Sequence, residues 1–171
     1  MILSLGWDPS TQGATWALLN VSPTSRDWIA YGTCIDDEGI AERLRLTKDL
    51  GERQGTPVAV CVETPMRGLN SKKGDESGAR KKAQNLMATA VVAGYIRGYS
   101  KACGLDTYAL PSWTIRTHLG LHGKTTDRMV ADALRLFVPN WPKNQSDDHD
   151  RDAGAAAVAG AVHRGVSRGW T

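Results

Sequence analysis

Two short apolar segments of the sequence each end in a carboxylate. Asp8 closes the segment 2–8 and Glu63 closes the segment 58–63, and both segments have the length and apolar character of strands. An ionised carboxylate at the end of a buried strand is costly to desolvate unless a positive charge meets it. Each acid alone is explained by an arginine partner or by contact with solvent. Two such strand ends in one chain need a further explanation.

A third acidic group opens the last predicted helix, which spans about 150–165. This group is the stretch 147–152, in which His149 and Asp152 lie three residues apart and share one helix face. Aspartates at a helix N-terminus are also favoured by capping and by the helix dipole, without any function. On its own, the cluster therefore has a sufficient structural explanation.

Taken together, the two strand ends and the helix start supply ligands whose mutual repulsion a hard cation relieves. Two Mg²⁺ or Mn²⁺ ions about 4 Å apart would activate water and stabilise the leaving oxygen of a phosphodiester. The residues thus indicate metal-dependent phosphodiester hydrolysis. The candidate catalytic and metal-binding residues are Asp8, Glu63, His149 and Asp152.

The remaining segments must position these side chains. Three consecutive strands with short links indicate an antiparallel meander, and a buried strand then alternates with helices. We therefore predict an α/β fold with a mixed five-stranded sheet, three antiparallel strands followed by parallel strands, and helices on both faces. The predicted strands are 2–8, 13–21, 28–35, 58–63 and 107–110, and the predicted helices are 40–54, 83–102, 127–138 and about 150–165.

Residue size along these elements gives more specific expectations. The many small residues of 83–102 predict that something packs closely against that helix. In the helix 127–138, one apolar stripe is predicted to comprise Met129, Val130, Ala133, Leu134 and Phe137. Alternation along the strands places Ser4 and Gly6 on the face of Asp8, and Ala59 and Cys61 on the face of Glu63.

Charge is segregated along the chain. Residues 65–101 hold eight basic and two acidic residues, whereas residues 27–63 hold eight acidic and four basic residues. The polar stretch 65–80 is longer than most connections, which favours a functional loop. Basic residues of this kind supply affinity for phosphates without reading bases. The candidate DNA-binding residues here are Arg67, Lys72, Lys73, Arg80, Lys81 and Lys82, with Arg116 and Lys124 in a second patch.

Composition excludes several classes of protein. The 171 residues, 41% of them hydrophobic, predict one folded domain over 1–171 rather than a disordered chain. A net charge of +3 does not by itself prove an anionic partner. Three cysteines without a Cys-x-x-Cys pair argue against a disulfide framework and a zinc knuckle. Because no leader and no apolar stretch of about 18 residues is present, we expect a cytoplasmic protein without a membrane partner.

Three motifs carry a family resemblance. Gly6-Trp7-Asp8-Pro9-Ser10, then Val60-Cys61-Val62-Glu63, then His149-Asp150-Arg151-Asp152-Ala153 before an Ala-rich helix occur in this order. The chain resembles the RuvC-type Holliday junction resolvases of the ribonuclease H-like superfamily, over nearly its whole length and at family-like spacing.

The resemblance implies a ribonuclease H-like fold and a metal-dependent endonuclease. Such an enzyme acts as a homodimer, with Mg²⁺ or Mn²⁺, and nicks two strands of a four-way DNA junction symmetrically. Carried over by motif, Asp8 would bridge two metals, and Glu63 and Asp152 would be the other carboxylates. His149, at a position where family members carry Asp or His, would bind a metal or handle the proton of the attacking water. The helix 83–102 would be the natural dimer surface, and ordinary packing of this helix on the sheet explains its small residues about equally well.

One departure and two alternatives accompany this interpretation. Family members often carry an aromatic wedge three residues after the Glu, where this chain has Met66, which can wedge into DNA but stacks poorly. A YqgF-like RNA-processing nuclease of the same superfamily is one alternative, and an inactive module that only binds branched DNA is the other. The acid/His spacing and the long basic loop favour the resolvase over the first. Intact acids at every motif position argue against the second, because a binding module gains nothing from carboxylates facing phosphates.

Overall fold

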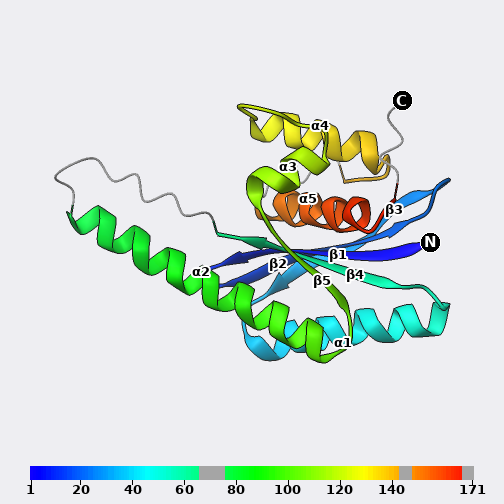
Figure 1. Ribbon diagram of the computed structural model, residues 1–171, viewed down its shortest axis with the longest axis horizontal. Helices are drawn as coiled ribbons and strands as arrows, with labels where there is room; N and C mark the ends of the chain where they lie inside the picture. The colour runs from blue at the N-terminus through cyan, green and yellow to red at the C-terminus, as the bar shows by residue number, and fades with distance from the viewer. Residues whose placement is uncertain (66–75, 143–147, 167–171) are drawn as a thin grey trace.

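The computed structural model describes residues 1–65, 76–142 and 148–166 (Figure 1). Five strands form one sheet in the order β3-β2-β1-β4-β5, with β1, β2 and β3 antiparallel and β1, β4 and β5 parallel. The predicted mixed sheet is confirmed. The strands are β1 (Ile2–Ser10), β2 (Gly13–Val21), β3 (Arg26–Cys34), β4 (Val58–Thr64) and β5 (Asp106–Pro111).

Helices cover both faces of this sheet, as predicted (Figure 1). On one face lie α1 (Asp37–Gln54) and α2 (Glu76–Ala102), and the N-terminal half of α2 extends beyond the edge of the sheet. On the other face α5 (Asp148–His163) packs directly on β1, β2 and β4, while α3 (Ser112–His118) and α4 (Asp127–Phe137) pack on α5. Among the described helices, none is both long and apolar enough to cross a lipid bilayer.

Local sequence explains how α1 is delimited. The Asp36 side chain accepts a hydrogen bond from the Gly39 backbone N–H at 2.8 Å, which caps the helix start. Gly55 ends the helix in the left-handed conformation, with a φ of 59°, which a residue without a Cβ adopts at little cost. Between these caps the helix buries Ile40 and Leu44 against the sheet, as the helical spacing of its apolar residues predicts.

The α5 helix lies unusually close to β1. A Cβ built on Gly6 would stand 2.1 Å from the carbonyl oxygen of Ala153 and 2.1 Å from the backbone nitrogen of Ala157. The Ser4 hydroxyl donates a buried hydrogen bond of 2.6 Å to the Ala157 carbonyl. Because Ser4 and Gly6 share the face of Asp8, as alternation predicts, this close contact aligns the start of α5 with the end of β1.

Four points of the helix prediction need correction. The α2 helix begins at Glu76 rather than at residue 83, and α3 was not predicted. Within the chain it is α5, not α2, whose small residues allow close packing, since nothing lies within 4 Å of a Cβ built on Gly94 or Gly98. Met129 is exposed instead of sharing the buried stripe of α4, because α4 packs on α5 through a narrower face.

Candidate active site

The two strand-end carboxylates leave adjacent parallel strands at the same level. The register of β1 with β4 pairs Trp7 with Val62, and Asp8 and Glu63 each follow one residue later. Asp8 is only 9% exposed, and Glu63 is partly buried. Both residues lie on the α5 face of the sheet, because their strand neighbours Gly6 and Cys61 contact α5.

The first turn of α5 brings His149 to the same place. His149 Nδ1 lies 2.6 Å from Asp8 Oδ2, a contact between side chains separated by 141 residues of sequence. The His149 side chain is half-exposed, whereas that of Asp8 is almost buried. A carboxylate that contacts one ring nitrogen fixes the orientation of the imidazole. His149 thus lies beside Asp8 at the end of β1, with its side chain partly exposed to solvent.

The surroundings of Glu63 raise its pKa. Burial is the largest cause, and the negative charges of Asp8 and Asp152 add to it, so that the pKa rises to about 7. A hydrogen bond from the Ser112 side chain and the positive charge of Arg116 act in the opposite direction. Asp8 and Asp152 therefore both lie close enough to Glu63 to repel its negative charge.

Asp152 sits in a mixed electrostatic setting. Burial raises its pKa above the ordinary value, the positive charges of Arg151 and Arg116 lower it, and the negative charges of Asp127 and Asp148 raise it again. On balance the pKa is raised.

Arg151 is largely buried and holds several acids near the start of α5. Its Nη1 lies 2.8 Å from Asp148 Oδ1, its Nη2 lies 3.4 Å from Asp127 Oδ1, and its Nε lies 3.7 Å from Asp152 Oδ1. Asp127 belongs to the start of α4, so this guanidinium joins α4 to α5 beside the candidate site. Sequence reasoning missed the roles of Arg151 and Ser112, which depend on contacts with distant segments. The one local signal was the spacing of Arg151 three residues after Asp148.

The donor set fits a hard divalent cation in its chemistry. Carboxylate oxygens suit Mg²⁺ or Mn²⁺, and the repulsion that raises the pKa of Glu63 is the kind that such a cation relieves. Over the described parts of the chain, no three His, Cys, Asp or Glu side chains are gathered tightly enough to form a ligand cage. Asp8 is instead engaged with His149.

The predicted DNA-binding residues have different positions. Arg80, Lys81 and Lys82 are exposed in the first turns of α2, and Lys124 is exposed between α3 and α4. Arg116 is partly buried, and its Nη1 donates a hydrogen bond of 2.8 Å to Thr125 Oγ1. The predictions that lie outside the described residues are those for Met66, Arg67, Lys72 and Lys73.

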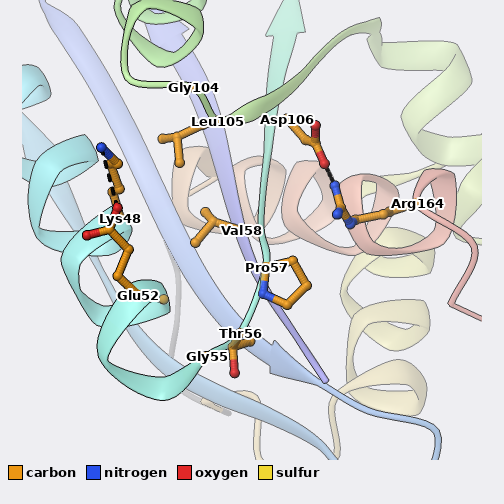
Figure 2. A pocket seen from close by; sticks show the side chains of 11 residues that line it. Lys48, Glu52, Gly55, Thr56, Pro57, Val58, Gly104, Leu105, Asp106 and Arg164 are labelled. Atoms are coloured by element: carbon orange, nitrogen blue, oxygen red, sulfur yellow. Dashed lines mark ion pairs between the residues drawn. The ribbon is translucent and has the colours of Figure 1, made fainter.

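A separate cavity of about 340 Å³ lies at the opposite end of the sheet, where β4 and β5 begin (Figure 2). Lys48 Nζ lies 3.5 Å from Glu52 Oε1, and Arg164 pairs with Asp106 on the cavity wall. These charged side chains neutralise one another. None of the predicted site residues that the structure describes lines this cavity, which is therefore distinct from the candidate active site.

Comparison with known proteins identifies the fold. No protein-family model matches the chain, and no curated protein matches its sequence. A structure of Thermus thermophilus RuvC aligns with a TM-score of 0.63 and 16% identity, covering 96% of each chain. T. thermophilus RuvC in complex with a Holliday junction substrate aligns with the same TM-score and identity, covering 95% of this chain and 93% of that one. At this identity the likeness concerns the fold, and the chain has the ribonuclease H-like fold of RuvC.

Proposed function

We propose that residues 1–171 form a RuvC-like nuclease that resolves four-way DNA junctions by metal-dependent phosphodiester hydrolysis. Two observations carry the proposal: His149 contacts Asp8 at the end of β1, and the negative charges of Asp8 and Asp152 lie close enough to Glu63, at the end of β4, to raise its pKa. The likeness of the fold to a RuvC solved with a Holliday junction substrate adds support.

The four residues would hold Mg²⁺ or Mn²⁺, with two ions per site. When bound, these ions supply the activation of water and the stabilisation of the leaving oxygen. The side chains of the protein would orient the reacting groups and meet the DNA phosphate. Asp8 orients His149 through Nδ1, which leaves Nε2 either to bind a metal or to accept a proton from the attacking water. Arg116 carries a positive charge close to both Glu63 and Asp152, where it would meet a phosphate of the DNA.

Exposed basic residues outside the carboxylate site supply further candidate contacts to DNA phosphates. Arg80, Lys81 and Lys82 project from the first turns of α2, and Lys124 projects from the segment between α3 and α4. Contacts from such side chains to phosphates depend on the shape of the DNA and not on its bases. This is the form of affinity that a structure-selective nuclease needs.

A homodimer would place two active sites on strands related by a two-fold axis. The surface that we propose for it is the outer face of α2, where Met87 and Val91 are exposed and the glycines at 94 and 98 meet no neighbouring atoms. A large exposed apolar side chain beside small residues suits close helix–helix contact.

We expect Val91→Glu to convert the dimer into a monomer, because two glutamates would then face each other across the axis. The measurement is molar mass by light scattering as a function of concentration. Val91 and Leu136 are 72% and 68% exposed, so Leu136→Glu on α4 is the matched control and should keep the wild-type mass. A Val91→Glu protein that remains dimeric would exclude this face of α2.

The proposed function is tested by offering the purified protein a synthetic four-way junction, a flap, a linear duplex and a structured RNA, each with Mg²⁺ and with chelator. We expect paired nicks in the junction that chelator abolishes. Cleavage of RNA alone would instead support the RNA-processing alternative, and tight junction binding without cleavage would support the inactive module.

A further inference from the structure

A second cavity, of about 240 Å³, adjoins the candidate active site. Ser112 and Arg116 line it, and these are the two residues whose hydrogen bond and positive charge act on the Glu63 carboxyl. The cavity and the site therefore share part of their wall. Its other lining residues include Trp113, Thr117, His122 and Thr125.

The wall of this cavity is built from two segments of the chain. Arg116, on α3, donates a hydrogen bond of 2.8 Å from Nη1 to Thr125 Oγ1, which lies just before α4. This bond ties together the two sides of the cavity and fixes the guanidinium. The volume is below the range of about 300–1,000 Å³ typical of sites for drug-sized ligands, so one flat ring fits better than an extended chain.

Trp113 gives the cavity its chemical character. The indole is 61% exposed, although tryptophan is highly buried on average. An exposed aromatic face beside hydrogen-bonding groups, here Arg116, His122 and the threonine hydroxyls, is the combination that recognises a nucleobase. A phosphate inside the cavity would need converging positive charges, whereas Arg116 is the one arginine or lysine among the described residues that line it.

We propose that this cavity receives one unpaired nucleobase of the DNA next to the scissile phosphate, with Trp113 stacking on its face. The proposal rests on the proposed function, because it places this base by reference to the nuclease site. Trp113 then becomes a residue that selects where on a branched DNA the strand is positioned for cleavage. Polar lining residues such as His122 and Thr117 would read the edge of the inserted base.

The test is a binding experiment in chelator, so that it needs no cleavage. The probes are a synthetic four-way junction and a single-stranded oligonucleotide of the same sequence, each with one abasic site moved stepwise along the strand. In the wild-type protein we expect one position at which the missing base weakens binding by about 10-fold. In Trp113→Ala the intact DNA should bind about 10-fold more weakly, and the abasic site at that position should cause no further loss.

Two variants act as controls. Trp113→Phe keeps an aromatic face and should restore most of the dependence on the base, which a purely structural role of Trp113 would not explain. Leu136→Ala removes an equally exposed apolar side chain outside this cavity and should bind all probes as the wild type does.

A flat abasic profile, or a profile that Trp113→Ala leaves unchanged, would overturn the base-binding proposal even if junctions are cleaved. The coupled loss on single-stranded DNA would support it even if no junction is cleaved. Absence of binding to both probes would overturn this proposal and the proposed function together.

Discussion

The contact between His149 Nδ1 and Asp8 Oδ2 joins the last described helix to the first strand. It pairs an almost buried carboxylate with a half-exposed imidazole, so the charge of Asp8 is met in part by the protein itself. Glu63 has weaker compensation, from Ser112 and Arg116, and keeps a strongly raised pKa. At the scale of single residues, the candidate site therefore places carboxylates close together although their negative charges repel.

This repulsion predicts a pH dependence of stability. Glu63 has a pKa of about 7 in the folded chain against 4.5 ordinarily, so its protonated form stabilises the fold fully below pH 4.5. That stability is lost as the pH rises towards 7, and it amounts to about 3 kcal/mol. The raised pKa of Asp152 acts in the same direction. The groups that face Glu63 are Asp8 from β1, Asp152 from α5, and Ser112 and Arg116 from α3.

We expect Glu63→Gln to flatten this dependence, because the amide carries no titrating charge. The measurement is the free energy of unfolding by urea at pH 5 and pH 7 in the presence of chelator. Glu52→Gln, at an exposed position on α1, is the control and should keep the wild-type slope. If the free energy of unfolding changed equally with pH in Glu63→Gln and in wild type, Glu63 would not be the carboxyl group with the raised pKa.

At the scale of elements, the site depends on how closely α5 approaches β1. Gly6 permits this approach, because any Cβ there would meet the backbone of α5. The Ser4 hydroxyl then links β1 to α5 directly, through its hydrogen bond to the Ala157 carbonyl. His149 and Asp152 reach the strand ends only because α5 lies at this distance and begins at this level.

We expect Gly6→Ala to destabilise the protein by about 3 kcal/mol or more, since backbone atoms cannot move aside as a flexible side chain can. The measurement is thermal and urea unfolding at concentrations that keep the chain monomeric. Gly94→Ala is the matched control. Its Cβ would meet open space on α2, and alanine favours a helix, so a small gain in stability is expected. A Gly6→Ala protein as stable as wild type would refute the tight contact.

The elements also mark how far the sequence could predict the structure. The strand pattern gave the mixed sheet, and alternation correctly assigned Gly6 and Cys61 to the face of their terminal acids. The helix α3 was missed because its seven residues make only about two turns, too few to show a repeating apolar pattern, and Pro111 precedes it without a side-chain cap. The contacts of Arg151 and Ser112 were missed because they join segments distant in sequence, which no local pattern encodes.

At the scale of the whole molecule, charge is divided between the two ends of the sheet. The end of β1 and β4 carries the acidic site, and the start of α2, with Arg80, Lys81 and Lys82, projects beyond the sheet at the same end (Figure 1). At the other end, the charged side chains of the cavity in Figure 2 pair with one another. DNA is therefore expected to approach from the side of the carboxylates.

We expect the double substitution of Lys81 and Lys82 by Ala to weaken junction binding and to reduce the slope of log K against log salt by about one to two. The measurement is a binding titration at several salt concentrations in chelator. Arg53→Ala combined with Lys101→Ala removes the same charge from the last turns of α1 and α2 and should leave the slope unchanged. If the two double variants had the same slope of log K against log salt, the start of α2 would not contact phosphates.

The central claim is that Asp8, Glu63, His149 and Asp152 act as one site that cuts DNA with divalent ions. Its most direct measurement compares nicking and binding of a synthetic four-way junction by Asp8→Asn, with Asp49→Asn on the exposed side of α1 as control. The account predicts that Asp8→Asn loses nicking by about 1,000-fold or more and keeps junction binding, while Asp49→Asn retains both. Full nicking by Asp8→Asn in Mg²⁺ would contradict it.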